Sequence, residues 1–127
     1  MEMNQIFRIP GGLFLQGAPV FVKEAAMYQQ EDGKLVAKLS MENKDAARTI
    51  CGVTVRFSPI APNGSVIGEG VIRQYENLQA EPAGLFGEEE LVELPEDSCA
   101  FGAAVLKVSF TDGTAWEAES KLAWHVL

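Results

Sequence analysis

Apolar and polar residues alternate with a period of two over much of the chain, in short runs that are separated by turn sequences. This period is typical of β-strands that bury one face. In residues 35–42, for example, Leu, Ala, Leu and Met alternate with Val, Lys, Ser and Glu. The dipeptide Asp32-Gly33 lies between this run and the preceding one, and it supplies the positive φ that a tight hairpin turn requires. The pattern predicts an all-β chain with very little helix.

Seven strands follow from this alternation, and residues 79–87 between them are predicted to be a crossover loop. The acid-rich strand is expected at a sheet edge, where charge discourages association between sheets. Two sets of alternating residues are expected to face the core. They are Thr49, Cys51, Val53, Val55 and Phe57 in the third strand and Ala104, Leu106, Val108 and Phe110 in the sixth. The predicted strands cover residues 20–30, 35–42, 49–57, 66–78, 88–94, 99–110 and 115–120.

Strands at this spacing fit an all-β fold of two antiparallel sheets, a β-sandwich of the immunoglobulin or fibronectin type III kind with about seven strands. A closed barrel stays open as the alternative, because strand count and alternation do not separate the two architectures. Residues 1–18 are interrupted by Pro10 and two glycines, and they are expected to form an N-terminal arm or an edge segment. Residues 19–127 are expected to form a single β-sandwich domain, which is enough chain for one core.

The charge of the chain is unevenly distributed. The 127 residues carry a net charge of -8, and residues 74–127 hold two Lys or Arg against eleven Asp or Glu. The acidity is centred on the segment from Glu88 to Asp97. Nucleic acid and anionic membrane surfaces would repel such a chain, so neither is expected as a partner. A protein partner should therefore be basic or neutral.

The start of the chain does not have the pattern of a secretory signal. Charged and turn-forming residues interrupt its apolar positions, whereas a signal needs an unbroken apolar run. No run reaches the ~18 apolar residues that a membrane helix requires. We expect a cytoplasmic protein, and the alternative is an exported protein given without its signal.

Candidate catalytic and metal-binding residues are few. His125 is the one histidine and there is no Cys-x-x-Cys motif, so neither a histidine-based triad nor a zinc site is expected. The segment from Glu88 to Asp97 lacks the spacing of a calcium loop and is interpreted as a solvated edge and loop. Binding of a cation or of a basic partner there stays open. No catalytic residue, metal site or cofactor is predicted.

The two cysteines, Cys51 and Cys99, raise the question of a disulfide. The first is expected at an inward position of the third strand and the second at the start of the sixth, so a bridge between the sheets is conceivable. Because the chain shows no export signal, two reduced and mostly buried thiols are the prediction. The disulfide is the alternative.

Five segments carry a resemblance to a known group of domains. They are residues 39–44 with 48–53, then 62–64, 94–97 and 105–116. In this order they resemble small bacterial immunoglobulin-like β-sandwich domains, which are common in Firmicutes, and the match runs from about Val20 to Glu117. The shared motifs are structural. The resemblance therefore implies a fold and brings no catalytic residues.

The function that fits these features is a non-enzymatic module that acts through its surface, in protein interaction or in an adhesion-type accessory role. Edge strands and termini of sandwiches are suited to binding a protein partner or a second copy of the chain. The alternative is a small-ligand or carbohydrate-binding domain, or a carboxylate-based hydrolase. It would use Tyr28, Tyr75, Trp116 or Trp124 as stacking platforms beside acidic side chains.

Overall fold

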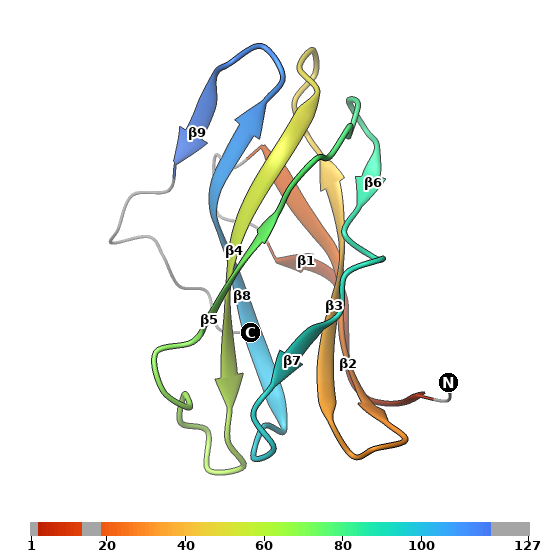
Figure 1. The fold of residues 1–127 in the computed structure, drawn as a ribbon, viewed down its shortest axis with the longest axis vertical. Helices are drawn as coiled ribbons and strands as arrows, with labels where there is room; N and C mark the ends of the chain where they lie inside the picture. Colours follow the sequence, from red (N-terminus) through yellow and green to blue (C-terminus); the bar gives the residue numbers. More distant parts are fainter. Residues whose placement is uncertain (1–2, 14–18, 118–127) are drawn as a thin grey trace.

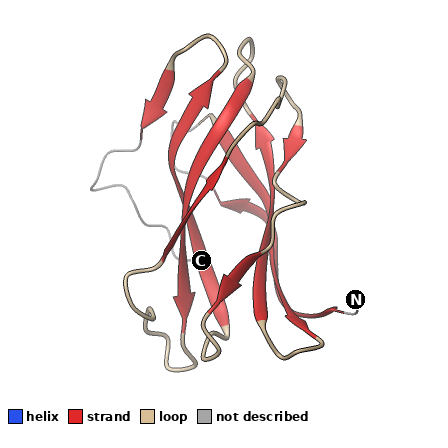
Figure 2. Cartoon of the chain, in the orientation of Figure 1, coloured by secondary structure: helices blue, strands red, loops and turns tan. Residues whose placement is uncertain are grey.

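The structure is a computed structural model, which describes residues 3–13 and 19–117. In these residues the regular structure is β-strand, arranged as two antiparallel sheets that face each other (Figure 1). No helix is drawn in the described part of the chain (Figure 2). The strands of the first sheet are β1 (Met3–Leu13), β2 (Val20–Gln30), β3 (Leu35–Asn43), β6 (Leu85–Phe86) and β7 (Val92–Leu94). Those of the second sheet are β4 (Ile50–Ile60), β5 (Val71–Tyr75), β8 (Ala100–Phe110) and β9 (Ala115–Glu117).

The order of the strands shows how the chain alternates between the sheets. The first sheet has the order β1-β2-β3, with β6 and β7 both paired to the far side of β3, and the second has the order β5-β4-β8-β9. The chain changes sheet after β3, after β5 and after β7. This is the arrangement of an immunoglobulin- or fibronectin-III-like sandwich. The predicted all-β sandwich is therefore confirmed, and the two separate sheets are not the closed barrel that was the alternative.

The hairpin of β2 and β3 matches the prediction in both its strands and its turn. Gly33 has a φ of 87°, and the amide of Lys34 donates to the carboxylate of Asp32. The alternating apolar set of β3 lies in the core, as expected from the sequence. Its members are Leu35, Ala37, Leu39 and Met41.

Two register shifts correct the predicted inner faces of the second sheet. One lies between Ile50 and Gly52 of β4, so Ile50 is fully buried and Cys51 is only half-buried. The other is opposite Thr54 and Val55 and leaves Leu106 of β8 without a partner. A bulge changes the face on which every residue beyond it lies. Phe101, Ala103 and Val105 therefore belong to the core cluster in place of Ala104 and Leu106.

The segments between β4 and β8 contain less strand than predicted. Only residues 71–75 of the expected strand 66–78 are strand, and Val66 forms an isolated bridge to Ile60. The expected loop at 79–87 contains β6, and only residues 92–94 of the acid-rich segment are strand. The expected strand 115–120 is seen as β9, and its residues 118–120 lie outside the described part.

The N-terminal segment is part of the first sheet. Residues 3–13 form β1, which pairs with β2 at the edge of that sheet. Its pairing is interrupted by two register shifts, one between Gln5 and Phe7 and one between Pro10 and Leu13. Proline cannot donate to a ladder, so the position of Pro10 on an edge strand leaves no ladder hydrogen bond unmade on its open side.

The loop that follows β3 is fixed by Asn43, whose side chain is buried. Its Nδ2 donates to the carbonyls of Arg48 at 2.9 Å and Ala80 at 2.8 Å, and its Oδ1 accepts the amide of Asp45 at 2.8 Å. The side chain thereby joins the β3–β4 loop to the chain between β5 and β6. The segment that follows β5 is held to the first sheet in this way.

A second set of contacts at the same loop involves Arg48. Its guanidinium lies over the ring of Phe110 at 3.9 Å and donates to Thr114 at 3.0 Å. It also donates to the carboxylate of Asp45, from Nη2 at 2.7 Å and from Nε at 3.0 Å. Together with the backbone amides of Ala47 and Arg48, this lowers the pKa of Asp45 to about 2. The contacts link the β3–β4 loop to the β8–β9 hairpin.

Candidate functional site

The four edges of the two sheets differ in how well they are protected against further pairing. In the first sheet, β1 contains Pro10 and two register shifts, and the opposite edge is divided between the short strands β6 and β7. In the second sheet, β9 has three described residues, whereas β5 pairs with β4 over five residues without a shift or a proline. Bulges, prolines and short strands are the usual ways in which sheet edges are blunted. Among the described edges, β5 is the longest that lacks all of them.

Side chains of β5 alternate between the core and the surface. Tyr75 is buried and Val71 packs against the core, while Ile72 is 54% exposed and Gln74 is exposed on the outer face. Within the described chain, the backbone of β5 pairs with β4 alone. Its outward N–H and C=O groups therefore have no strand beside them in the described part of the chain.

The start of β5 depends on a glycine. Gly70 has a φ of 90°, and a Cβ atom at this position would lie 2.8 Å from the carbonyl oxygen of Phe57. That contact is with backbone, so a side chain could not be accommodated by a change of rotamer. Gly70 lets the chain approach β4 closely, so that the pairing of β5 with β4 can begin at Val71, which lies opposite Phe57.

The side chain of Tyr75 on β5 contacts the first sheet at Gly87. The ring of Tyr75 lies over Gly87, where a Cβ atom would be 3.8 Å from the ring but 2.9 Å from the Met41 side chain and 3.0 Å from the Leu39 carbonyl oxygen. Only glycine suits this position, which also has a φ of 98°. The hydroxyl of Tyr75 is buried without a hydrogen-bond partner, and burial raises its pKa. The Tyr75 side chain therefore contributes to packing in the core.

An ion pair between Arg73 and Glu90 lies at the surface, next to the contact of Tyr75 with Gly87. Nη2 of Arg73 on β5 is 2.7 Å from Oε2 of Glu90, which raises the pKa of Arg73. Glu90 belongs to a turn closed by a hydrogen bond from its own amide to the Gly87 carbonyl. We name residues 87–90 the acidic turn, because Glu88 and Glu89 are exposed in its middle. The predicted solvated acidic loop is confirmed at these positions, although it is a turn and not a strand.

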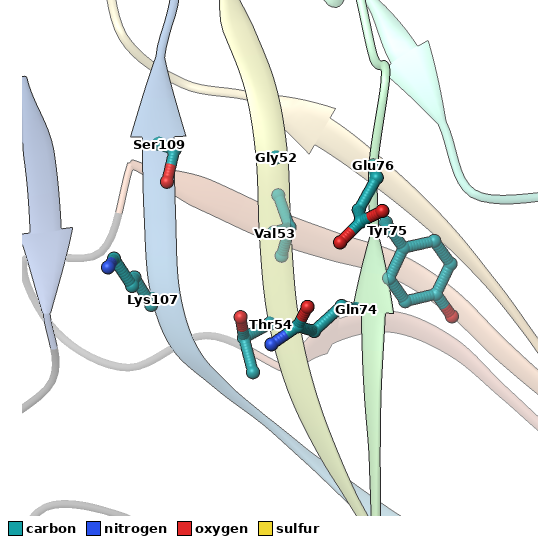
Figure 3. A pocket seen from close by; sticks show the side chains of 8 residues that line it. All are labelled: Gly52, Val53, Thr54, Gln74, Tyr75, Glu76, Lys107 and Ser109. Carbon is teal, nitrogen blue, oxygen red and sulfur yellow. The ribbon is translucent and has the colours of Figure 1, made fainter. Parts of the chain in front are cut away.

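A shallow polar pocket of about 190 Å³ lies on the outer face of the second sheet (Figure 3). It exists because Gly52, in the bulge of β4, puts no side chain between the neighbouring strands. Around it stand Thr54, Gln74, Glu76, Lys107 and Ser109. The ring of Tyr75, by contrast, is turned to the far side of β5 from Gly52 (Figure 3). The pocket therefore offers hydrogen-bonding groups and no aromatic face.

The other predicted stacking residues do not meet at a site either. Tyr28 lies on the first sheet beneath Lys38, whose Nζ is 5.4 Å from the ring centre. Trp116 is half-buried against the core. Trp124 and His125 lie outside the described residues.

The cysteines are free, which is the state expected from the sequence. The predicted positions were wrong, however, because Cys51 is half-buried at the bulge and Cys99 is exposed. The amide of Cys99 donates to the carbonyl of Ile60, the last residue of β4, and Cys51 is the second residue of that strand. At ~3.3 Å per residue the two lie roughly 30 Å apart, far beyond the reach of a disulfide.

Neither a metal centre nor a membrane span is seen in the described residues. No group of three or more His, Cys, Asp or Glu side chains in that part of the chain is placed to hold a metal ion. The same residues contain no helix long and apolar enough to cross a membrane.

In residues 3–13 and 19–117, the fold and this site define a β-sandwich with one regular strand edge that has no further pairing, beside an acidic turn. Comparison with known proteins adds no relative, since no protein-family model, no curated protein and no solved structure matches. The resemblance to bacterial immunoglobulin-like domains therefore stays a prediction.

Proposed function

We propose that the protein is a non-enzymatic β-sandwich module that binds another protein, by adding an extended segment of it to β5. The observation that supports this most directly is the five-residue edge of β5, which has no backbone partner beyond β4 among the described residues. A kinship with bacterial immunoglobulin-like domains is part of the proposal and rests on the resemblance in sequence.

Strand addition uses groups that β5 already presents. The main-chain hydrogen bonds of an added strand supply affinity, and side chains that alternate between the two faces supply selectivity. Ile72 offers an apolar contact on the outer face, beside the polar Gln74. Since β5 is held by regular pairing with β4 and by the Arg73–Glu90 ion pair, little of it remains to be ordered on binding.

The alternative of a carbohydrate-binding domain or a carboxylate-based hydrolase has less support. Sugar-binding sites stack rings of the ligand on exposed aromatic faces, whereas Tyr75 is buried and Trp116 packs on the core. Glu76 is the one carboxylate among the described residues that line the polar pocket. A hydrolase of this kind needs two facing carboxyl groups.

The proposal is tested with a peptide that can form a strand but carries no charge. The probe is a ten-residue peptide of alternating Val and Ser with blocked ends, and binding is measured by calorimetry and by amide hydrogen exchange. We expect slower exchange in β5 on binding. Ile72→Lys should weaken binding at least tenfold, because lysine on an edge opposes strand addition.

Val66→Lys is the matched control. It makes the same change at an apolar residue that is 44% exposed but lies outside β5, in the β4–β5 loop. We expect it to bind the peptide as the unchanged protein does. If the two variants behave alike, or if protection appears on another strand, the proposal that β5 is the binding edge is wrong.

A further inference from the structure

We infer that the strand added to β5 belongs to a basic segment, in which Lys or Arg alternates with apolar residues. This inference rests on the proposed function and specifies the partner. It is drawn from the charges around the open edge and from the pleat of the sheet.

Carboxylates flank β5 on three sides. Glu69 precedes the strand and Glu76 follows it directly, and both are exposed. Glu88 and Glu89 are exposed in the middle of the acidic turn, which meets β5 at the contact of Gly87 with Tyr75. The structure gives none of these four carboxylates an ion-pair partner within the described residues.

Arg73 is the positively charged residue of β5, and it is paired with Glu90 at 2.7 Å. It therefore neutralises one carboxylate of the acidic turn and leaves Glu88 and Glu89 without an ion pair among the described residues. A segment lying along β5 would enter a region of negative potential. Lys and Arg would be attracted there and Asp and Glu repelled.

A second copy of the chain is a poorer occupant for the same reason. Antiparallel pairing of β5 with β5 of another copy would bring two sets of these carboxylates together, and each copy carries a net charge of -8. Like charges facing each other across an interface destabilise it. The open edge therefore suits a partner of opposite charge.

The pleat of the sheet sets the expected pattern of that partner. Successive side chains of an added strand point to opposite faces of the sheet. Those on the outer face would lie beside Ile72, which favours apolar residues, and those on the other face would lie toward Arg73 and the acidic turn. We therefore expect apolar and basic residues to alternate along the added strand.

The test compares three blocked ten-residue peptides in which Val alternates with Lys, Ser or Glu. We expect the Val–Lys peptide to bind at least tenfold more tightly than the Val–Ser peptide at low salt, and the Val–Glu peptide not to bind. Raising the salt concentration to 0.5 M should remove most of the difference, because the screening length falls to about 4 Å.

A charge-neutral variant locates the effect. Glu88→Gln with Glu89→Gln should weaken binding of the Val–Lys peptide about three- to tenfold and leave that of the Val–Ser peptide unchanged. Glu31→Gln with Glu96→Gln is the matched control, since both residues are exposed in turns outside the β5 edge. We expect the control to bind all three peptides like the unchanged protein.

The outcomes separate this inference from the proposed function. Equal binding of the Val–Lys and Val–Ser peptides at β5 would overturn the basic partner and keep the binding edge. Failure of every peptide to bind would overturn both. A dimer in sedimentation, with β5 amides protected in the absence of peptide, would assign the edge to a second copy and refute the inference.

Discussion

Replacement of Asn43 by alanine should destabilise the fold more than its position at the end of β3 suggests. The side chain is 1% exposed, and three hydrogen bonds to the backbone use both of its amide hydrogens and its oxygen. Alanine would remove this donor from the buried carbonyl of Ala80, which would keep the bond from the amide of Ile50 at 2.9 Å, and it would remove the bonds to Arg48 and Asp45 altogether. A buried polar group that loses its partner cannot recover the bond from water.

The size of the effect follows from the number of bonds. At about 1 kcal/mol net for each of the three hydrogen bonds, Asn43→Ala should lower the free energy of unfolding by about 3 kcal/mol. For a chain of this length that corresponds to a fall in Tm of about 10 °C. Asn43→Asp keeps the shape but replaces a donor by acceptors, so its cost should decrease as the pH falls and the new carboxyl becomes protonated.

Asn63→Ala provides a matched comparison for this prediction. Asn63 is also an asparagine in a turn, and its Oδ1 accepts from the amide and hydroxyl of Ser65, but it is exposed. Its replacement should cost less than about 1 kcal/mol, because water can take over the lost bonds. Urea unfolding followed by tryptophan fluorescence measures both variants. Equal losses for the two asparagines would refute the argument from burial.

Three further predictions concern single residues. Gly87→Ala should lower stability by about 3 kcal/mol in urea unfolding, against about 1 kcal/mol for Gly64→Ala, because both have a positive φ but only Gly87 is crowded; similar losses would contradict this. Tyr75→Phe should leave stability unchanged or raise it by up to about 1 kcal/mol, since the hydroxyl has no partner, and a clear loss would show that it has one. The carboxyl of Asp45 has its pKa lowered to about 2, so it stabilises the fold above its ordinary pKa of 3.8 and ceases to do so as the pH falls through about 2. The difference in urea midpoint between the protein and its Asp45→Asn variant should shrink over that range; a constant difference would exclude the ion pair with Arg48 as its cause.

The parts of the fold that could be predicted from sequence are those set by local chemistry. The β2–β3 hairpin follows from two alternating runs and an Asp-Gly dipeptide, all of which act within a few residues. Faces were mispredicted where the chain has a bulge. At neither register shift, the one at Gly52 or the one at Leu106, does the sequence contain a residue that occurs only in bulges.

The candidate site could not be predicted, because it depends on which strand lies at an edge. The sequence predicted a strand over residues 66–78, yet it did not show that, within the described residues, β5 pairs with β4 alone. Strand order results from contacts between residues far apart in the chain. The pairing of Arg73 with Glu90, and of Tyr75 with Gly87, likewise joins positions that no local pattern relates.

The acidic segment illustrates how the structure changes the meaning of a charge pattern. In the sequence, Glu88 to Glu90 were expected to protect an edge strand of their own. In the structure they form a turn against β5, so their charge acts on the neighbouring sheet's edge. Charges that protect an edge against a second acidic copy also attract a basic strand to it. Under the proposed function, the same carboxylates would disfavour pairing with a second acidic copy and favour a basic strand, and the Val–Glu and Val–Lys peptides measure this repulsion and attraction at the same strand.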